Sequence, residues 1–128
     1  MSALAEARDE LRTNERQWQA FTTEGHCVVI APPGSGKTKL LTTRLANDLV
    51  TRIKRPHGAA CITLTNAAAD ELERRLDALG VDRRSTLFVG TVHSFALARI
   101  ILPFASVAGY PELSNPRIAS EREGLSAC

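Results

Sequence analysis

The residues best able to do chemistry in this chain form one glycine-rich stretch, Ala-Pro-Pro-Gly-Ser-Gly-Lys-Thr, at positions 31–38. Its glycine spacing is typical of a phosphate-binding P-loop, in which backbone N–H groups surround a β-phosphate and a Cβ would block the approach. In such a loop Lys37 reaches the β- and γ-phosphates, and the Thr38 hydroxyl is a ligand of Mg²⁺. The stretch therefore predicts a site for a nucleoside phosphate and Mg²⁺.

The sequence on both sides of the loop predicts the elements that must position it. Residues 26–31 are a short apolar run rich in β-branched side chains, which predicts a strand buried on both faces of a parallel sheet. Apolar residues then recur at helical spacing and predict a helix over residues 37–54. The N-terminus of this helix would point at the phosphates. A ligand-free turn between a strand and a helix is the alternative, and this order of elements disfavours it.

The rest of the chain repeats the order strand then helix. Further strands are predicted at residues 59–65 and 86–90. Further helices are predicted at residues 3–11, 15–22, 66–79 and 92–102. Their predicted end signals are Asn14 and Asn66 as N-caps, Gly80 as a C-terminal cap and Pro103 as a stop. This alternation predicts an α/β fold with a parallel sheet and flanking helices.

Composition limits the remaining possibilities. A chain of 128 residues with 44% hydrophobic residues can form one modest domain, and a net charge of +2 does not by itself indicate a nucleic-acid or membrane partner. No apolar run approaches the roughly 20 residues that span a bilayer, and the N-terminus does not resemble a signal peptide. We therefore expect a cytoplasmic protein without a membrane partner. Cys27 and Cys61 lie in predicted buried strands and Cys128 ends the chain; without a CxxC pair, they predict packing and not metal binding.

Four separated segments together resemble the opening motifs of UvrD/Rep-type superfamily 1 DNA helicases, in order and in spacing. They are residues 14–17, 31–38, 63–72 and 90–95. The resemblance covers about residues 11–102 and implies a partial RecA-like P-loop NTPase domain. It assigns residues 1–104 to the first RecA-like lobe, the ATP-binding domain, and residues 105–128 to the start of an inserted helical subdomain.

The resemblance also implies roles for individual residues. Gln17 corresponds to a glutamine that reads adenine, and a side-chain amide can bond adenine N6 and N7 together. Lys37 and Thr38 correspond to the catalytic residues, and Thr38 to the Mg²⁺ ligand. The implied ATP contacts are Gln17, Ala31, Pro32, Pro33, Gly34, Ser35, Gly36, Lys37, Thr38 and Lys39.

The third and fourth segments correspond to contacts with single-stranded DNA. The implied contact residues are Leu64, Thr65, Asn66, Thr91 and His93. They follow predicted parallel strands, whose carboxyl ends gather ligands, and their hydroxyl, amide and imidazole groups can bond phosphates without reading sequence. Leu64 stands where relatives usually have Phe, which removes an aromatic surface for base stacking. Taken alone, Asn66 is a helix cap and His93 a packed first-turn residue.

Parts of a complete ATPase are absent from the sequence. Hydrolysis requires carboxylates that hold Mg²⁺ and orient water, together with arginines, and no run of four apolar residues leads into Asp-Glu. Asp70 and Glu71 fall inside a predicted helix and are expected on its solvated surface. We therefore expect the N-terminal portion of an ATP-dependent helicase, inactive alone. ATP and single-stranded DNA are its expected partners, and the remaining helicase lobes on another chain are a further candidate. The alternatives are a non-catalytic module that binds ATP or single-stranded DNA, and a small P-loop kinase, which would have no use for the third and fourth segments.

Overall fold

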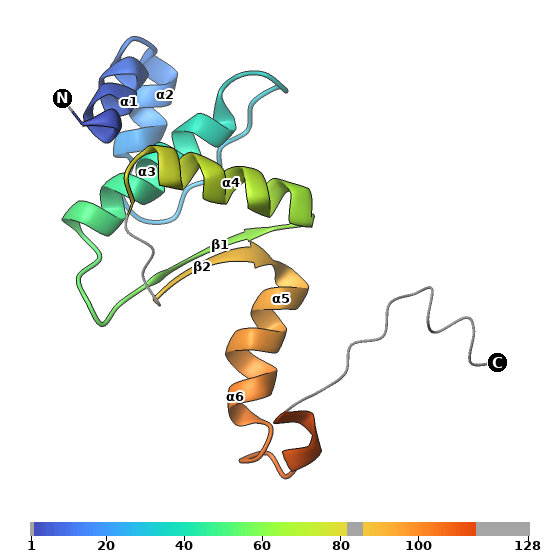
Figure 1. Ribbon diagram of the computed structural model, residues 1–128. Coiled ribbons are helices and arrows are strands. Elements are labelled where there is room, and N and C mark those ends of the chain that lie inside the picture. The colour runs from blue at the N-terminus through green and yellow to red at the C-terminus, as the bar shows by residue number, and fades with distance from the viewer. Residues whose placement is uncertain (1, 82–85, 115–128) are drawn as a thin grey trace. The chain divides into compact units, whose positions relative to one another are not determined.

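The computed structural model describes residues 2–81 and 86–114, and the chain divides after Thr91 into two compact units (Figure 1). The first unit contains helices α1 (Ala3–Arg12), α2 (Glu15–Thr22), α3 (Lys37–Thr51) and α4 (Asn66–Ala78) and strands β1 (Ala59–Thr63) and β2 (Leu87–Thr91). The second contains α5 (Val92–Ala96), a π-helical segment (Leu97–Ile101), α6 (Leu102–Phe104) and a 3-10 turn (Pro111–Ser114). Cys128 and residues 118–125 lie outside the described residues.

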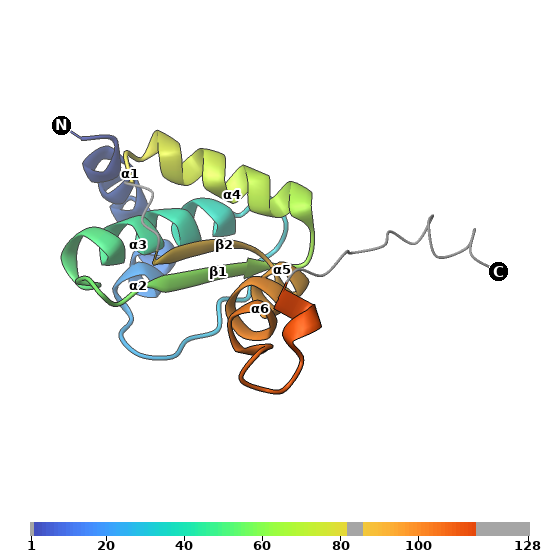
Figure 2. The ribbon, with the colours of Figure 1, turned by 60° about the horizontal axis from the view of Figure 1, so that its bottom comes forward.

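The two strands of the first unit are parallel, as predicted. Ala59 pairs with Leu87 and Thr63 with Thr91, so both strands end side by side. Helix α4 connects them in sequence and lies along the sheet, contacting both strands (Figure 2). The sequence therefore predicted the α/β class correctly, in a sheet that has two strands among the described residues.

Helix α3 lies at the centre of the first unit and contacts α1, α2 and α4. The buried apolar side chains of this unit are Leu11, Leu40, Ala46, Leu49, Cys61, Ala69, Leu72 and Leu76. Their spacing within α3 and α4 follows the predicted helical period. Helix α3 ends at Thr51, three residues before the predicted end, because the Ile53 N–H bonds to the Asp48 carbonyl, five residues back, whereas α-helical bonds reach back four.

The strand predicted at residues 26–31 is wrong. These residues have no regular secondary structure, and Val28 and Ile30 are 86% and 94% exposed. Cys27, which the same prediction buried, is exposed. An apolar run becomes a buried strand only when a neighbouring strand pairs with it, and in the described sheet β1 and β2 pair with each other.

Two of the predicted cap residues, Asn14 and Gly80, lie at helix ends as expected, and the N-cap of α4 is shifted by one residue. The Asn14 side chain accepts a hydrogen bond from the Gln17 N–H, as predicted for an N-cap. In α4 the N-cap is Thr65 and not Asn66, because the Thr65 hydroxyl accepts from the Ala68 N–H. Gly80 ends α4 with a φ of 74°, as predicted.

The last α-helix ends at Phe104, one residue after Pro103 and two residues after the predicted end. Helical structure continues from Val92 to Phe104 through the π-helical segment. There the Leu102 N–H bonds to the Leu97 carbonyl, five residues back. This wider turn precedes the proline, whose ring otherwise clashes with the carbonyl four residues before it.

Among the described residues, no helix is long and apolar enough to cross a membrane.

Candidate nucleotide site

The glycine-rich loop makes a turn that leads directly into α3. Gly34 and Gly36 have φ values of 76° and 84°, in the left-handed region that glycine adopts without strain. The Ser35 N–H donates to the Pro32 carbonyl at 3.3 Å. Gly36 is the N-cap of α3 and has no side chain to accept from the N–H groups of the first turn. The positive end of α3 therefore keeps backbone donors for an anion.

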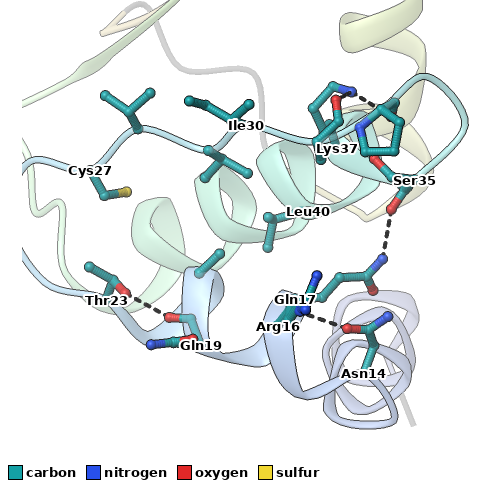
Figure 3. Close-up of a pocket in the computed structure, with 16 residues that line it drawn as sticks. Asn14, Arg16, Gln17, Gln19, Thr23, Cys27, Ile30, Ser35, Lys37 and Leu40 are labelled. Atoms are coloured by element: carbon teal, nitrogen blue, oxygen red, sulfur yellow. Dashed lines mark hydrogen bonds between the residues drawn. The ribbon is translucent and has the colours of Figure 1, made fainter.

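Lys37 begins α3 and bends back over the loop. Its Nζ donates to the Pro32 carbonyl at 2.8 Å and to the Ala31 carbonyl (Figure 3). The side chain is otherwise exposed. The only cation on the loop itself therefore lies beside the uncapped end of α3, where a phosphate group would be attracted to both.

Gln17 comes to the loop from a different helix. Its Nε2 donates to the Ser35 carbonyl at 2.9 Å, which links α2 to the loop (Figure 3). A Cβ added to Gly36 would lie 2.9 Å from the same nitrogen, so the glycine leaves space for the amide. The residue that the resemblance assigns to adenine is thus hydrogen-bonded to the glycine-rich loop.

A hollow of about 630 Å³ lies between α2, residues 27–32 and the start of α3. Pockets for small molecules and cofactors have volumes of roughly 300 to 1,000 Å³. Six predicted ATP contacts line it together: Gln17, Ala31, Pro32, Ser35, Gly36 and Lys37. The hollow thus brings the Gln17 amide and the Lys37 ammonium group to one surface.

Four other predicted contacts do not line this hollow. They are Pro33, Gly34, Thr38 and Lys39. Thr38 is exposed in the first turn of α3. Lys39 forms an ion pair with Glu10 of α1.

The structure adds lining residues that the sequence analysis missed. Arg16, Gln19, Ala20 and Thr23 line the hollow from α2 and its C-cap. They stand at positions i, i+3, i+4 and i+7, so they share one helix face. Helical periodicity counted from Arg16 could have identified this face.

The predicted DNA contacts lie where the strands end. Leu64 is 91% exposed, Asn66 is exposed, and Thr65 caps α4. Thr91 is buried at the end of β2, opposite Thr63. The fifth contact, His93, is exposed in α5, which belongs to the second unit.

The carboxylates of α4 lie on the surface, as predicted. Asp70 is exposed, and Glu71 pairs with Arg74 and with Arg75, the latter at 2.6 Å. Hydrogen bonds from these two arginines lower the pKa of the Glu71 carboxyl. Among the residues that the structure describes, no group of three or more His, Cys, Asp or Glu side chains could hold a metal ion.

Comparison with known proteins gives one consistent family. The model of the UvrD/REP helicase N-terminal domain matches residues 13–118. The chain is 38% identical over 87 residues to a protein named DNA helicase II from Rickettsia typhi, covering 65% of this chain and 12% of that protein. It is 38% identical over 85 residues to the ATP-dependent DNA helicase PcrA from Staphylococcus aureus, covering 66% of this chain and 12% of that protein. The matched region therefore spans about an eighth of the length of these relatives.

Proposed function

The chain belongs to the UvrD/REP helicase family through its N-terminal domain, and we propose that it binds ATP as part of a UvrD-like DNA helicase. The observation that carries the proposal is the shared hollow of Gln17, Lys37 and the uncapped start of α3. Gln17 would bond the adenine edge, and Lys37 would exchange its loop carbonyls for β- and γ-phosphate oxygens. Residues 1–104 would then form part of a RecA-like lobe, and residues 105–128 would begin a helical subdomain.

Mg²⁺ fits the donor set at the start of α3. Thr38 offers one exposed hydroxyl, and Mg²⁺ in nucleotide sites takes most of its ligands from phosphates and water. When bound, the ion would neutralise charge on the phosphates. Thr38 would hold it through its Oγ1.

We propose that the ends of β1 and β2 contact single-stranded DNA. Leu64, Thr65, Asn66 and Thr91 lie at this edge of the sheet, and His93 follows in α5. Hydroxyl and amide groups here would bond the DNA backbone without reading sequence. Stepping along DNA in the 3'-to-5' direction would require the remaining helicase lobes, on this polypeptide or another.

A non-catalytic module is the second candidate function. The surface positions of Asp70 and Glu71 favour it, because neither residue lines the hollow beside the glycine-rich loop, where hydrolysis would require a carboxylate. Such a module would bind ATP and single-stranded DNA without turnover.

Calorimetric titration of ATP–Mg²⁺ into the chain and into Lys37→Ala tests the proposal. The variant should bind ATP at least about tenfold more weakly, because a charge-assisted bond to phosphate is worth roughly 1.5 to 3 kcal/mol. Its fold should be unchanged, since Lys37 is exposed. Lys54→Ala, which removes an exposed lysine away from the hollow, is the matched control. Equal ATP affinity of Lys37→Ala and the unmodified chain would reject the site.

A further inference from the structure

We propose that Arg44 is a positioning residue for base recognition: it holds α2 on α3 and so fixes the place of Gln17 at the phosphate-binding loop. The part that concerns the base rests on the proposed function. The part that concerns α2 rests on geometry alone.

Arg44 lies in α3, seven residues after Lys37, and bonds to backbone of α2. Its Nη1 donates to the Ala20 carbonyl at 2.7 Å, and its Nη2 donates to the Thr23 carbonyl. Together these two bonds form the Arg44 bridge. The Arg44 side chain is only 19% exposed, so the bridge is partly shielded from water.

The Arg44 bridge bonds to the C-terminal end of α2, where a cation is stabilising. The last carbonyls of a helix lack partners within the helix and carry the negative end of its dipole. No basic residue stands in the last turn of α2. The Arg44 guanidinium, supplied by α3, therefore takes the role that a C-terminal Lys or Arg of α2 would have.

A second contact orients the Arg44 side chain. Its Nε lies 3.9 Å from the Asp48 carboxylate, one turn further along α3. The planar guanidinium can then face Asp48 with one edge and the α2 carbonyls with the other. Nη1 also lies 3.6 Å from the Cys27 sulfur, in the segment that leads into the loop.

Helix α2 has little else to hold it on α3. None of its residues is buried, so apolar packing alone places it weakly. Its two large aromatic side chains, Trp18 and Phe21, stack on each other, and Trp18 also contacts Arg12 of α1. Gln17 stands one turn before Ala20 and reaches the Ser35 carbonyl at 2.9 Å. A movement of α2 by one or two ångströms would break that contact, so the bridge determines whether Gln17 faces the site.

The test compares the full-length Arg44→Ala variant with the unmodified chain in their affinities for ATP, GTP and inorganic tripolyphosphate. ATP affinity should fall about tenfold and the preference for ATP over GTP should be lost, because Gln17 is no longer held in place. Tripolyphosphate affinity should stay near that of the unmodified chain, because it depends on Lys37 and the start of α3. Arg44→Lys should lie between the two, since one ammonium group cannot hold both carbonyls as a guanidinium does.

Two comparisons separate positioning from a general structural effect. Arg52→Ala is the matched control, because Arg52 also lies beside Asp48, at 3.8 Å, but is not bonded to α2. It should change none of the three affinities. Combining Arg44→Ala with Gln17→Ala should lower ATP affinity no further than either change alone, because both remove the same interaction. Additive losses, or an equal loss of ATP and tripolyphosphate affinity, would overturn the proposal.

Hydrogen exchange separates this proposal from the proposed function. Backbone amides of α2 should exchange faster in Arg44→Ala than in Arg52→Ala, with or without nucleotide. If the unmodified chain binds neither ATP nor tripolyphosphate, the proposed function fails, but hydrogen exchange still tests whether Arg44 holds α2 in place. Unchanged exchange across α2 in Arg44→Ala would overturn the structural role of Arg44. If Arg44→Ala does not fold, Arg44→Lys, which keeps the charge, must show the same shifts in smaller degree or the proposal falls.

Discussion

At the scale of single residues, Cys27 and Cys61 differ in their access to reagents. Cys61 is 6% exposed in β1, and burial raises the pKa of its thiol. Cys27 is exposed at the rim of the hollow. Because the thiolate is the reactive form, a raised pKa and burial both slow the reaction of Cys61.

We predict that iodoacetamide at about pH 8, below the ordinary thiol pKa of about 8.5, modifies Cys27 first and leaves Cys61 protected. Mass spectrometry of the two peptides measures the rates separately. In denaturant both should react at similar rates, which serves as the control. Equal rates in the folded chain would contradict the burial of Cys61.

The residue types in residues 31–38 predicted the structure of the loop itself better than they predicted its contacts with other elements. The glycine spacing predicted a loop that needs unusual backbone angles, and Gly34 and Gly36 have positive φ values. The role assigned to Gln17 came from family resemblance, since a lone glutamine carries no local signal, and its bond to the loop is seen only in the structure. Arg44 was missed because its partners are backbone carbonyls, which leave no pattern in a sequence.

At the scale of elements, hydrophobic periodicity predicted α3 and α4 to within a few residues and failed at residues 26–31. Helical hydrogen bonds are local, so a helix can be read from its own sequence. A strand depends on a partner distant in the chain. Residues 59–63 pair with such a strand, β2. Within the described residues no strand pairs with the apolar residues 26–31, and most of them are exposed.

The N-cap of α4 separates a structural role from the proposed DNA contact. Thr65→Ala removes the hydroxyl that caps α4 and should destabilise the fold by about 1 kcal/mol. Asn66→Ala, one residue further, should leave stability within about 0.5 kcal/mol, because its side chain is exposed. Urea denaturation measures both values.

The same pair tests the DNA surface. Asn66→Ala should weaken binding of a fluorescent single-stranded oligonucleotide while the fold stays intact. The slope of log affinity against log salt should be shallow, about 0.7 for each phosphate contacted. Full DNA affinity in a folded Asn66→Ala, His93→Ala double variant would exclude both side chains as DNA contacts.

At the scale of the whole molecule, the two units differ in how much of the chain they bury. In the first, α3 and α4 supply most of the core. In the second, Ala105 is the buried apolar residue among those described, whereas Ile100, Phe104 and Val107 are exposed. The sequence predicted the family from four motifs, but a pattern of local elements holds no information on how such units are arranged.

We predict that these 128 residues alone hydrolyse ATP at a rate near background. The sequence offers no carboxylate at the end of an apolar strand, and Glu71 is ion-paired on the surface of α4. An arginine finger alone contributes about 10³ to 10⁵ in rate in P-loop enzymes. Phosphate release would be measured with single-stranded DNA present and Lys37→Ala as the blank. DNA-stimulated turnover that the variant lacks would show a complete catalytic set in this chain.

We expect the loop and the start of α3 to bind the phosphates of a nucleotide. Backbone amide chemical shifts, followed during titration with ATP–Mg²⁺, test this binding residue by residue. The largest changes should occur at Gly34, Ser35, Gly36, Lys37 and Thr38, and should saturate together with changes at the Gln17 side-chain amide. Amides of β1, away from the hollow, should stay nearly unchanged. Saturable changes confined to the basic segment of residues 52–57, or no changes at the loop, would contradict phosphate binding by the loop.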